Sequence, residues 1–239
     1  MTAARPDGKK INTRSMDFTH LHPWKVSLEK AIQIQNNLRQ RLESGIGFPR
    51  LKTVAGADVE YREGKAYGAV AVLSVPRMKL VEQACACCEI NFPYLPGFLS
   101  FREGPVLLEC FCQLSRKPDV VIFDGQGIAH PRGFGIAAHL GLLLDCPTVG
   151  CAKSKLFGHV EEPGLSRGSQ ARLLDDSGRT IGAALRTREK VRPVYVSPGF
   201  KMDLAGSLKT VLTCSTKYRI PEPLRKAHQL ARQAALEGN

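Results

Sequence analysis

The sequence predicts an α/β protein whose central mixed sheet is flanked by helices, and three observations lead to this fold class. Strand-like runs at 53–61, 66–75 and 79–90 are joined by connections short enough for antiparallel hairpins. An unbroken apolar run at 118–127 suits a strand that is buried on both faces. A helical pattern and a second buried strand follow this run, which indicates a crossover between parallel strands. A meander and a parallel pair together predict a mixed sheet.

The helices and the remaining strands follow from the spacing of apolar residues and from breakers. Apolar positions between Lys25 and Glu43 form one helical face, and "SGIGFPR" ends that helix. A short helix is expected just before residue 118. The other predicted elements are a helix at 133–145, a strand at 146–154, a hairpin at 171–187, a strand at 191–198, a helix at 203–212 and a basic helix from Pro223 onward.

The domain organisation is predicted to be a flexible tail followed by one domain. Residues 1–22 are polar and without a period, so they are expected to form a tail in which His20 and His22 are solvated. Residues 23–239 are expected to form a single catalytic domain. The start of the chain has no apolar core of a signal peptide, and the apolar run at 68–75 is too short to span a bilayer. We therefore expect a cytoplasmic protein without membrane contact.

The charge balance favours a polyanionic partner. The chain has 34 Lys and Arg residues against 22 Asp and Glu residues, a formal net charge of +12. Nucleic acid is the partner class that this excess favours, although basic soluble proteins without nucleic acid share it.

The eight cysteines allow a zinc site but do not favour one. They are Cys85, Cys87, Cys88, Cys110, Cys112, Cys146, Cys151 and Cys214. The "CACC" and "CFC" clusters have spacings that thiolate zinc sites use. Both clusters lie in runs typical of a strand and a buried helix, where free cysteine behaves as a small hydrophobic residue. Burial without metal is the preferred interpretation.

Three carboxylates fall inside or at the ends of elements that the pattern buries. They are Asp58, Glu103 and Asp124. A buried carboxylate is costly unless a cation or hydrogen bonds offset its charge, and ligands of open α/β sheets gather at strand ends. Oxygen donors without nearby His or Cys at zinc spacing suit a hard cation such as Mg²⁺. Taken singly, each acid has another interpretation: a turn residue, a charge at a helix start, or a cap.

A glycine-rich stretch follows the third acid. "DGQGIAHPRGFG" allows a ligand to approach the main chain closely. Its spacing is not that of a dinucleotide fingerprint, and the chain has no phosphate loop.

Six motifs in order resemble the endonuclease V family, a family of repair nucleases that act at deaminated purines. They are "GADVEY", "FPYLPGFLSFREGP", "VIFDGQGIAHPRGFGIAAHLG", "PTVGCAKSKLFG", "VSPGFKMDL" and "YRIPEPLRKAH". The resemblance covers residues 25–235. It implies a ribonuclease H-like fold, in which three antiparallel strands are followed by two parallel ones.

The resemblance also implies a catalytic set. Asp58, Glu103 and Asp124 match the family's metal ligands, which would hold Mg²⁺, or Mn²⁺ in its place, against the scissile phosphate. Lys153 matches a lysine that would neutralise charge on the phosphate. His228 lies where some members carry a histidine near the water and metal.

A DNA-binding wedge is implied for the "PYLP" loop. Tyr94 would enter the duplex beside the lesion while the damaged base swings out. Pro93 and Pro96 preset the backbone on either side of Tyr94 and Leu95, so that less loop entropy is lost on insertion.

The resemblance implies a lesion pocket with glycine-rich walls. Main-chain NH groups in it would donate to the carbonyl that hypoxanthine carries in place of adenine's amine. The expected lining residues are Leu99, Gly125, Gly127, Gly135, Ile136, Gly150 and Leu156. His130 matches a position that contacts phosphate, whereas His139 is expected to be structural. Gln126 departs from the residue common in relatives, so no role is assigned to it.

The predicted function is a magnesium-dependent DNA repair endonuclease. It would cut the second phosphodiester bond 3′ to inosine and leave 3′-hydroxyl and 5′-phosphate ends. The expected partner is DNA with deaminated bases, bound by a monomer. Two alternatives are an endoribonuclease acting mainly on inosine-containing RNA and a non-catalytic nucleic-acid-binding protein of the same fold.

Overall fold

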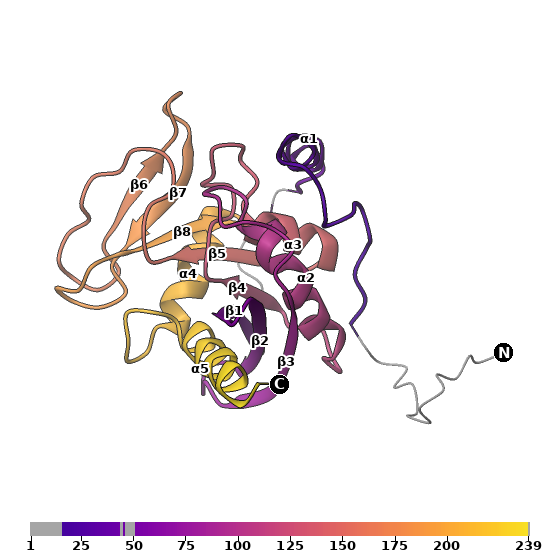
Figure 1. Ribbon diagram of the computed structural model, residues 1–239. Helices are drawn as coiled ribbons and strands as arrows, with labels where there is room; N and C mark the ends of the chain where they lie inside the picture. Colours follow the sequence, from indigo (N-terminus) through magenta and orange to yellow (C-terminus); the bar gives the residue numbers. More distant parts are fainter. Residues whose placement is uncertain (1–15, 44, 46–50, 239) are drawn as a thin grey trace, which may run out of the picture.

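The computed structural model describes residues 16–43, 45 and 51–238 of the chain (Figure 1). The helices are α1 (Leu28–Arg39), α2 (Leu99–Cys112), α3 (Ile136–Leu144), α4 (Leu204–Cys214) and α5 (Glu222–Glu237). The strands are β1 (Thr53–Arg62), β2 (Lys65–Ser74), β3 (Leu80–Glu89), β4 (Val120–Phe123), β5 (Thr148–Ala152), β6 (Gln170–Leu174), β7 (Thr180–Leu185) and β8 (Val194–Pro198).

Within the described residues the strands form one eight-stranded mixed sheet in the order β3-β2-β1-β4-β5-β8-β7-β6. β1, β2 and β3 pair antiparallel, and β4 and β5 continue from β1 in parallel. The predicted meander and parallel pair are therefore confirmed. The later strands extend the sheet through antiparallel pairs of β5 with β8, β8 with β7 and β7 with β6.

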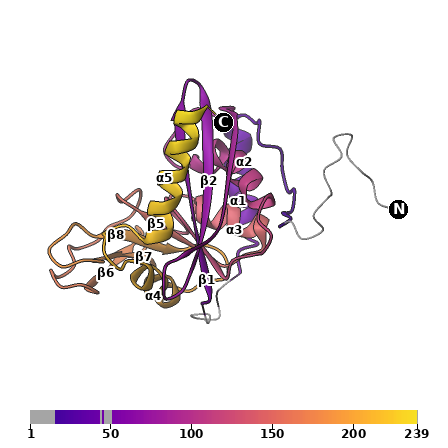
Figure 2. The same ribbon diagram turned by 90° about the horizontal axis from the view of Figure 1, so that it is seen from below.

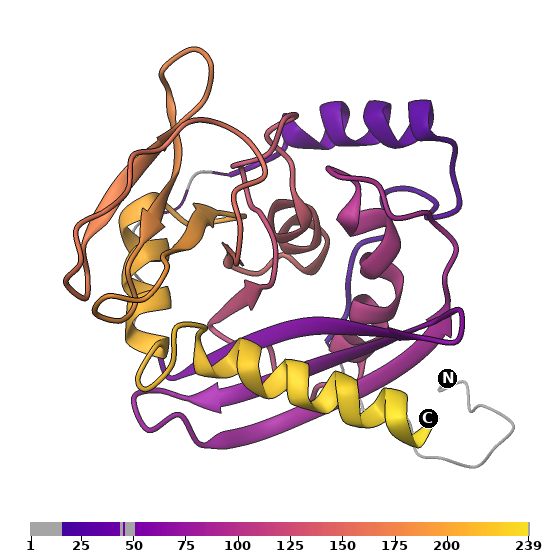
Figure 3. The ribbon, with the colours of Figure 1, turned by 60° about the vertical axis from the view of Figure 1, so that its left-hand side comes forward.

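Helices cover both faces of the sheet (Figure 2). α2 and α3 pack on one face, where α1 lies outside them through Ala31, Ile34 and Leu38. α4 and α5 pack on the other face, and Figure 3 shows α5 running along the meander strands. Two layers of helices around one sheet are the arrangement expected when parallel strands lie at its centre.

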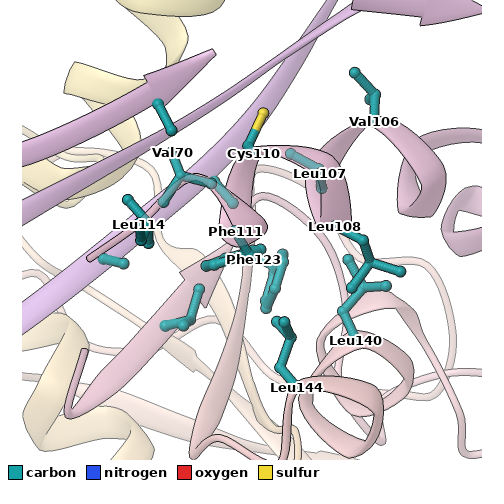
Figure 4. Close-up of a cluster of buried hydrophobic side chains, with 14 of the residues drawn as sticks. Val70, Val106, Leu107, Leu108, Cys110, Phe111, Leu114, Phe123, Leu140 and Leu144 are labelled. Carbon is teal, nitrogen blue, oxygen red and sulfur yellow. The ribbon is translucent and has the colours of Figure 1, made fainter. Parts of the chain in front are cut away.

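The largest apolar cluster fills the space between the sheet and the α2–α3 layer (Figure 4). Phe111 and Leu107 of α2 meet Phe123 of β4 and Leu140 of α3, and all four are at least 98% buried. Because β4 supplies only buried side chains, its end is fixed rigidly in this core. The residue that follows β4 is therefore held in one position.

The predicted boundary of the N-terminal tail at residue 22 lies too far along the chain. Met16 is buried in the main cluster, and its backbone NH donates to the carbonyl of Leu114 at 3.2 Å. The NH of Thr19 donates to the carbonyl of Leu143 at 2.8 Å. Residues 16–22 are thus part of the packed domain, and residues 1–15 lie outside the described part of the chain.

A glycine in β1 lets α5 lie directly on the sheet. A Cβ atom at Gly56 would stand 2.2 Å from the carbonyl carbon of Pro223 in the first turn of α5. Only a residue without a side chain allows this approach, so Gly56 sets the height of α5 above β1. No helix in the described part of the chain has the length and apolarity needed to cross a membrane.

Candidate active site

Two acids meet where β4 ends. Ala57 of β1 is paired in parallel with Phe123, the last residue of β4, so Asp58 and Asp124 come next on neighbouring strands. β1 continues to Arg62 after β4 has ended. The two carboxylates therefore lie on neighbouring strands at the point where the pairing of β1 with β4 ends.

Glu103 reaches this place from α2. The hydroxyl of Tyr61, on β1, donates to Glu103 Oε1 at 3.0 Å. The guanidinium of Arg102 lies over the Tyr61 ring, 4.4 Å from its centroid. One oxygen of Glu103 is thereby oriented by β1, the same strand that carries Asp58.

Two of the three carboxylates, Asp58 and Glu103, have raised pKa values. Burial raises the pKa of Glu103 to about 8, and the charges of Asp58 and Asp124 act in the same direction. Burial also raises the pKa of Asp58, with the charge of Asp124 as the second cause. Raised pKa values in a low-dielectric site indicate that the negative charges of the acids are not fully balanced. A bound cation can supply the missing positive charge.

Two basic side chains already hold two of the acids. Lys153, just after β5, forms an ion pair with Asp124 Oδ2. His228 of α5 bonds through Nδ1 to Asp58 Oδ2 at 2.8 Å. The carbonyl of Lys153 accepts from Arg219 Nη2 at 2.8 Å, which fixes the backbone under the lysine. The site thus joins three acids, one ammonium group and one imidazole from five different elements or their ends.

The donor set fits a hard divalent cation. Carboxylate oxygens are the ligands that Mg²⁺ and Mn²⁺ prefer, and three acids within electrostatic reach of one another provide them. Among the described residues, no three His, Cys, Asp or Glu side chains form a metal-binding group as they stand. Lys153 and His228 contact the Oδ2 atoms of Asp124 and Asp58 in this arrangement, and each of these carboxylates has a second oxygen with which it could ligate a cation. The cysteines are free thiols, of which Cys110, Cys146, Cys151 and Cys214 are buried and Cys85, Cys87, Cys88 and Cys112 are partly exposed.

A cavity of about 350 Å³ reaches the acid cluster at Asp124. Asp124 and Lys153 lie on its wall, together with Gln126, His130 and Ser100. Five of the seven residues predicted for a lesion pocket line it, namely Leu99, Gly125, Gly135, Ile136 and Leu156.

Gly127 and Gly150, also predicted for the lesion pocket, do not line this cavity. A Cβ atom on Gly150 would lie 2.3 Å from the backbone nitrogen of Gly127. The NH of Gly127 donates to Ser197 Oγ at 2.8 Å. The two glycines pack against each other behind the wall, and the Gly127 NH already has a partner.

The predicted wedge forms one side of the cavity. Tyr94 is 70% exposed, whereas Phe92 and Phe98 on either side of the loop are buried. Tyr94, Leu95 and Pro96 all border the cavity. An exposed aromatic ring on a loop with buried ends is suited to contact a partner.

The base of this loop is held by one carbonyl oxygen. Gly97, with φ +83°, turns its carbonyl toward Gln35 Nε2 at 3.0 Å, His130 Nε2 at 2.9 Å and Arg132 Nη2 at 2.7 Å. Burial lowers the pKa of His130 to about 4, so the ring is neutral at neutral pH. His130 therefore braces the wedge, and its predicted contact with phosphate stays a prediction.

Four side chains at the site carry no prediction from the sequence: Tyr61, Gln35, Ser100 and Arg219. Tyr61 and Arg219 lie within the motifs "GADVEY" and "YRIPEP", which could have drawn attention to them. Gln35 gives no local signal, because a polar residue on an amphipathic helix is usually solvated, yet it is fully buried here. His22, predicted to be solvated, is bonded to His139 instead, at 2.7 Å.

A mixed sheet with a parallel centre, and acids gathered where its strands end, defines a nuclease of the ribonuclease H-like fold. The comparisons with known proteins agree with this class. The family model described as Endonuclease V matches residues 28–229, and the chain belongs to that family. It is an endonuclease of a family of metal-dependent nucleases that act in DNA repair.

The relatives match over nearly their whole length. Endonuclease V of Methanothrix thermoacetophila is 47% identical over 92% of this chain and 97% of its own. The crystal structure of endonuclease V from Streptomyces avermitilis is 40% identical and superposes with a TM-score of 0.86, covering 90% of this chain and 96% of that one. Endonuclease V of Ciona intestinalis, solved with a 23mer DNA containing an inosine followed by a ribo-adenosine, is 28% identical with a TM-score of 0.78 and covers 90% and 100%.

Proposed function

We propose that this endonuclease nicks DNA at deaminated purines, with hypoxanthine as the base that it recognises. It cuts the second phosphodiester bond 3′ to the lesion and leaves 3′-hydroxyl and 5′-phosphate ends. One observation carries this proposal: the Tyr94 loop and the pair of Asp124 and Lys153 line the same cavity. A flipped base in the cavity would thus lie beside the groups that cut the strand. The inosine-containing DNA held by the Ciona intestinalis relative supports the same substrate.

Recognition begins with the wedge. Tyr94 stacks in the gap that the flipped nucleotide leaves, which offsets part of the unstacking cost of a few kcal/mol. The cavity wall then excludes water from the base through Leu99, Ile136 and Leu156. Main-chain NH groups of the glycine-rich wall donate to the hypoxanthine carbonyl, a contact that the amine of adenine cannot make.

Cleavage depends on the acid cluster. A divalent cation, Mg²⁺ or Mn²⁺ in its place, would supply Lewis-acid stabilisation of the phosphate and of the departing oxygen when held by Asp58, Glu103 and Asp124. Tyr61 orients Glu103, and His228 holds Asp58 at 2.8 Å and can receive or orient a water proton at its other ring nitrogen. Lys153, released from Asp124, places its charge on the phosphate.

A nicking assay with mapped ends tests this function. A labelled duplex with one inosine is incubated with the chain and Mg²⁺ beside an undamaged duplex and an inosine-containing RNA. We expect a single nick in the inosine strand, directly 3′ to the neighbouring nucleotide, so that this neighbour carries the new 3′-hydroxyl end. Preferential cleavage of the RNA would make the endoribonuclease alternative correct, and no cleavage of either strand would overturn the proposal.

The metal assignment is tested by Asp124→Asn. Loss of this ligand should lower the nicking rate by about 100-fold or more, because a ligated cation contributes several kcal/mol to the transition state. Asp176→Asn is the matched control, since that side chain is 75% exposed on the β6–β7 turn. A wild-type rate for Asp124→Asn would show that the acid is not a ligand.

A further inference from the structure

A chain of hydrogen bonds runs from the cavity wall to the N-terminal segment. Ser100 Oγ lies 2.9 Å from His139 Nδ1, and His139 Nε2 lies 2.7 Å from His22 Nε2. His22 Nδ1 lies 2.8 Å from the carbonyl oxygen of Pro23. Ser100 is in the first turn of α2 and lines the cavity, while His139 of α3 is fully buried.

The direction of every bond in this chain is determined by its last member. The carbonyl of Pro23 can only accept, so His22 Nδ1 carries a proton and His22 Nε2 accepts. His139 Nε2 must then donate to His22, which leaves His139 Nδ1 to accept from the Ser100 hydroxyl. This order holds for neutral imidazoles. With an added proton, His22 Nε2 would donate to His139 Nε2 and His139 Nδ1 would donate to the Ser100 hydroxyl, so both of these bonds would reverse their direction. The added charge would also lie beside the fully buried His139, where desolvation disfavours it.

The same N-terminal segment presses a tryptophan against α2. The Trp24 ring lies 4.6 Å from the His22 ring and 5.3 Å from the His139 ring, between centroids. A Cβ atom on Gly104, one residue after Glu103, would stand 2.6 Å from the Trp24 ring. Residues 22–24 therefore fasten the first turns of α2 from the side opposite to the sheet.

Other charged groups of the packed elements do not complete the chain. On the segment itself, His20 stacks on Phe18 and Lys25 is exposed. On α2, Arg102 donates to the Phe92 carbonyl and Glu103 accepts from Tyr61. On α1, Glu29 and Lys30 are exposed, and α3 has no titratable residue besides His139.

We propose that His22 and His139 are positioning residues for the base cavity: their neutral pair holds Ser100 and the start of α2 in place, and an added proton releases them. This inference rests on the proposed function for its link to inosine, but the pair itself can be observed without substrate. The match to the family model covers residues 28–229, and His22 and Trp24 lie outside that range.

The proton dependence follows from burial. Burial lowers the pKa of His22 and lowers that of His139 well below its ordinary value of 6.5. The native pair therefore stays neutral above pH 6.5 and its stabilisation is complete there. Below pH 6.5 the unfolded or released chain takes up protons more readily than the native pair, so the contact weakens as the pH falls.

Trp24 is the sole tryptophan and reports on the pair directly. A protonated imidazole beside an indole quenches its fluorescence, so emission should fall in a titration that begins below pH 6.5. Two substitutions at the half-buried His22 separate the roles. His22→Gln keeps an acceptor for His139 but cannot titrate, whereas His22→Leu removes the hydrogen bond.

We expect His22→Gln to abolish the fluorescence titration and to keep the wild-type KM for an inosine duplex at pH 7.5. His22→Leu should raise that KM about 3- to 10-fold, the effect of one lost hydrogen bond, with kcat within about twofold. A KM unchanged in His22→Leu, or a titration that persists in His22→Gln, would overturn the inference. If the Trp24 fluorescence of the wild-type chain changes with pH as expected but the chain nicks no inosine strand, the inference about the His22–His139 pair is supported and the proposed function fails.

Discussion

At the scale of single residues, the site is built from side chains that hold other side chains. Tyr61 holds Glu103, His228 holds Asp58, and Lys153 holds Asp124. The contacts to Glu103 and Asp58 stabilise carboxylates that burial among like charges would otherwise favour as the neutral acid. Such partners determine where the carboxylate oxygens point, so their removal should lower the nicking rate.

Tyr61→Phe should therefore reduce nicking without unfolding the chain. The substitution removes the hydrogen bond to Glu103 Oε1 and keeps the ring under Arg102. A hydrogen bond to a charged group contributes about 1.5–3 kcal/mol, so we expect the nicking rate to fall by about 10- to 100-fold, with more metal needed for half-maximal rate. Tyr218→Phe is the control, because that ring also lies under an arginine, Arg225, but away from the acids. Equal rates for the two variants would show that Tyr61 does not orient Glu103.

Tyr94→Ala separates recognition from catalysis. The side chain is 70% exposed, so the free energy of unfolding should change little. Stacking on a base contributes about 1–3 kcal/mol, and the KM for the inosine duplex should rise about 5- to 150-fold while the dependence of the rate on Mg²⁺ concentration stays as in the wild type. A parallel loss in metal dependence would mean that Tyr94 acts on the acid cluster and is not a wedge.

At the scale of elements, the position of α5 decides whether His228 reaches Asp58. α5 lies on β1 because Gly56 admits the backbone of Pro223, and its apolar side chains Leu224 and Ala227 are buried under it. His228 follows in the next turn and bonds Asp58 on the same strand as Gly56. One glycine thus sets the distance between a helix and a strand that both contribute to the site.

Gly56→Ala should lower the free energy of unfolding by about 1–3 kcal/mol or more, the cost of forcing extra volume into a packed interface. The Cβ atom would meet backbone, which cannot rotate away. Gly178→Ala is the comparison, because it has φ +80° but open space around it, and strain alone should cost about 1 kcal/mol. Urea denaturation of both variants gives the two free energies. A larger loss for Gly178→Ala would show that α5 accommodates the methyl group by shifting.

The order of elements could be predicted from the sequence because local patterns produce it. The runs at 53–61, 66–75 and 79–90 became β1 to β3 within one or two residues, since strand periodicity and short connections are local signals. The antiparallel pairing of β8 with β5 could not be predicted in the same way, because pairing between strands distant in the sequence leaves no local pattern.

The acids of the site were also predictable, whereas its supports were not. Asp58 and Asp124 stand out as charges in apolar runs. His22 lies in a polar stretch without a period, so its bond to His139 of α3 has no sequence signal. Gly127 and Gly150 resembled pocket residues because both occur in the motifs, but the main chain packs on both of them from behind. Long-range packing decided these cases.

At the scale of the whole molecule, a chain with a net charge of +12 contains a cluster of three acids. A positive field attracts DNA over a Debye length of about 8–10 Å at ordinary salt, whereas in the proposed function the acids act only at the cut phosphate. Attraction by the field does not depend on sequence or damage, whereas the proposed function assigns the recognition of inosine to the cavity. Affinity and selectivity should therefore respond differently to salt.

This difference can be measured by titrating salt in binding experiments with inosine and undamaged duplexes in the presence of a chelator, so that no strand is cut. Neutralising about four phosphates releases their counterions and gives a fall in affinity of about 100-fold between 50 and 200 mM salt for both duplexes. The ratio of the two affinities should stay nearly constant, because hydrogen bonds and stacking in the cavity involve no counterion. A ratio that falls as steeply as the affinities would mean that charge also carries the discrimination, and an affinity indifferent to salt would remove the basic surface from DNA binding altogether.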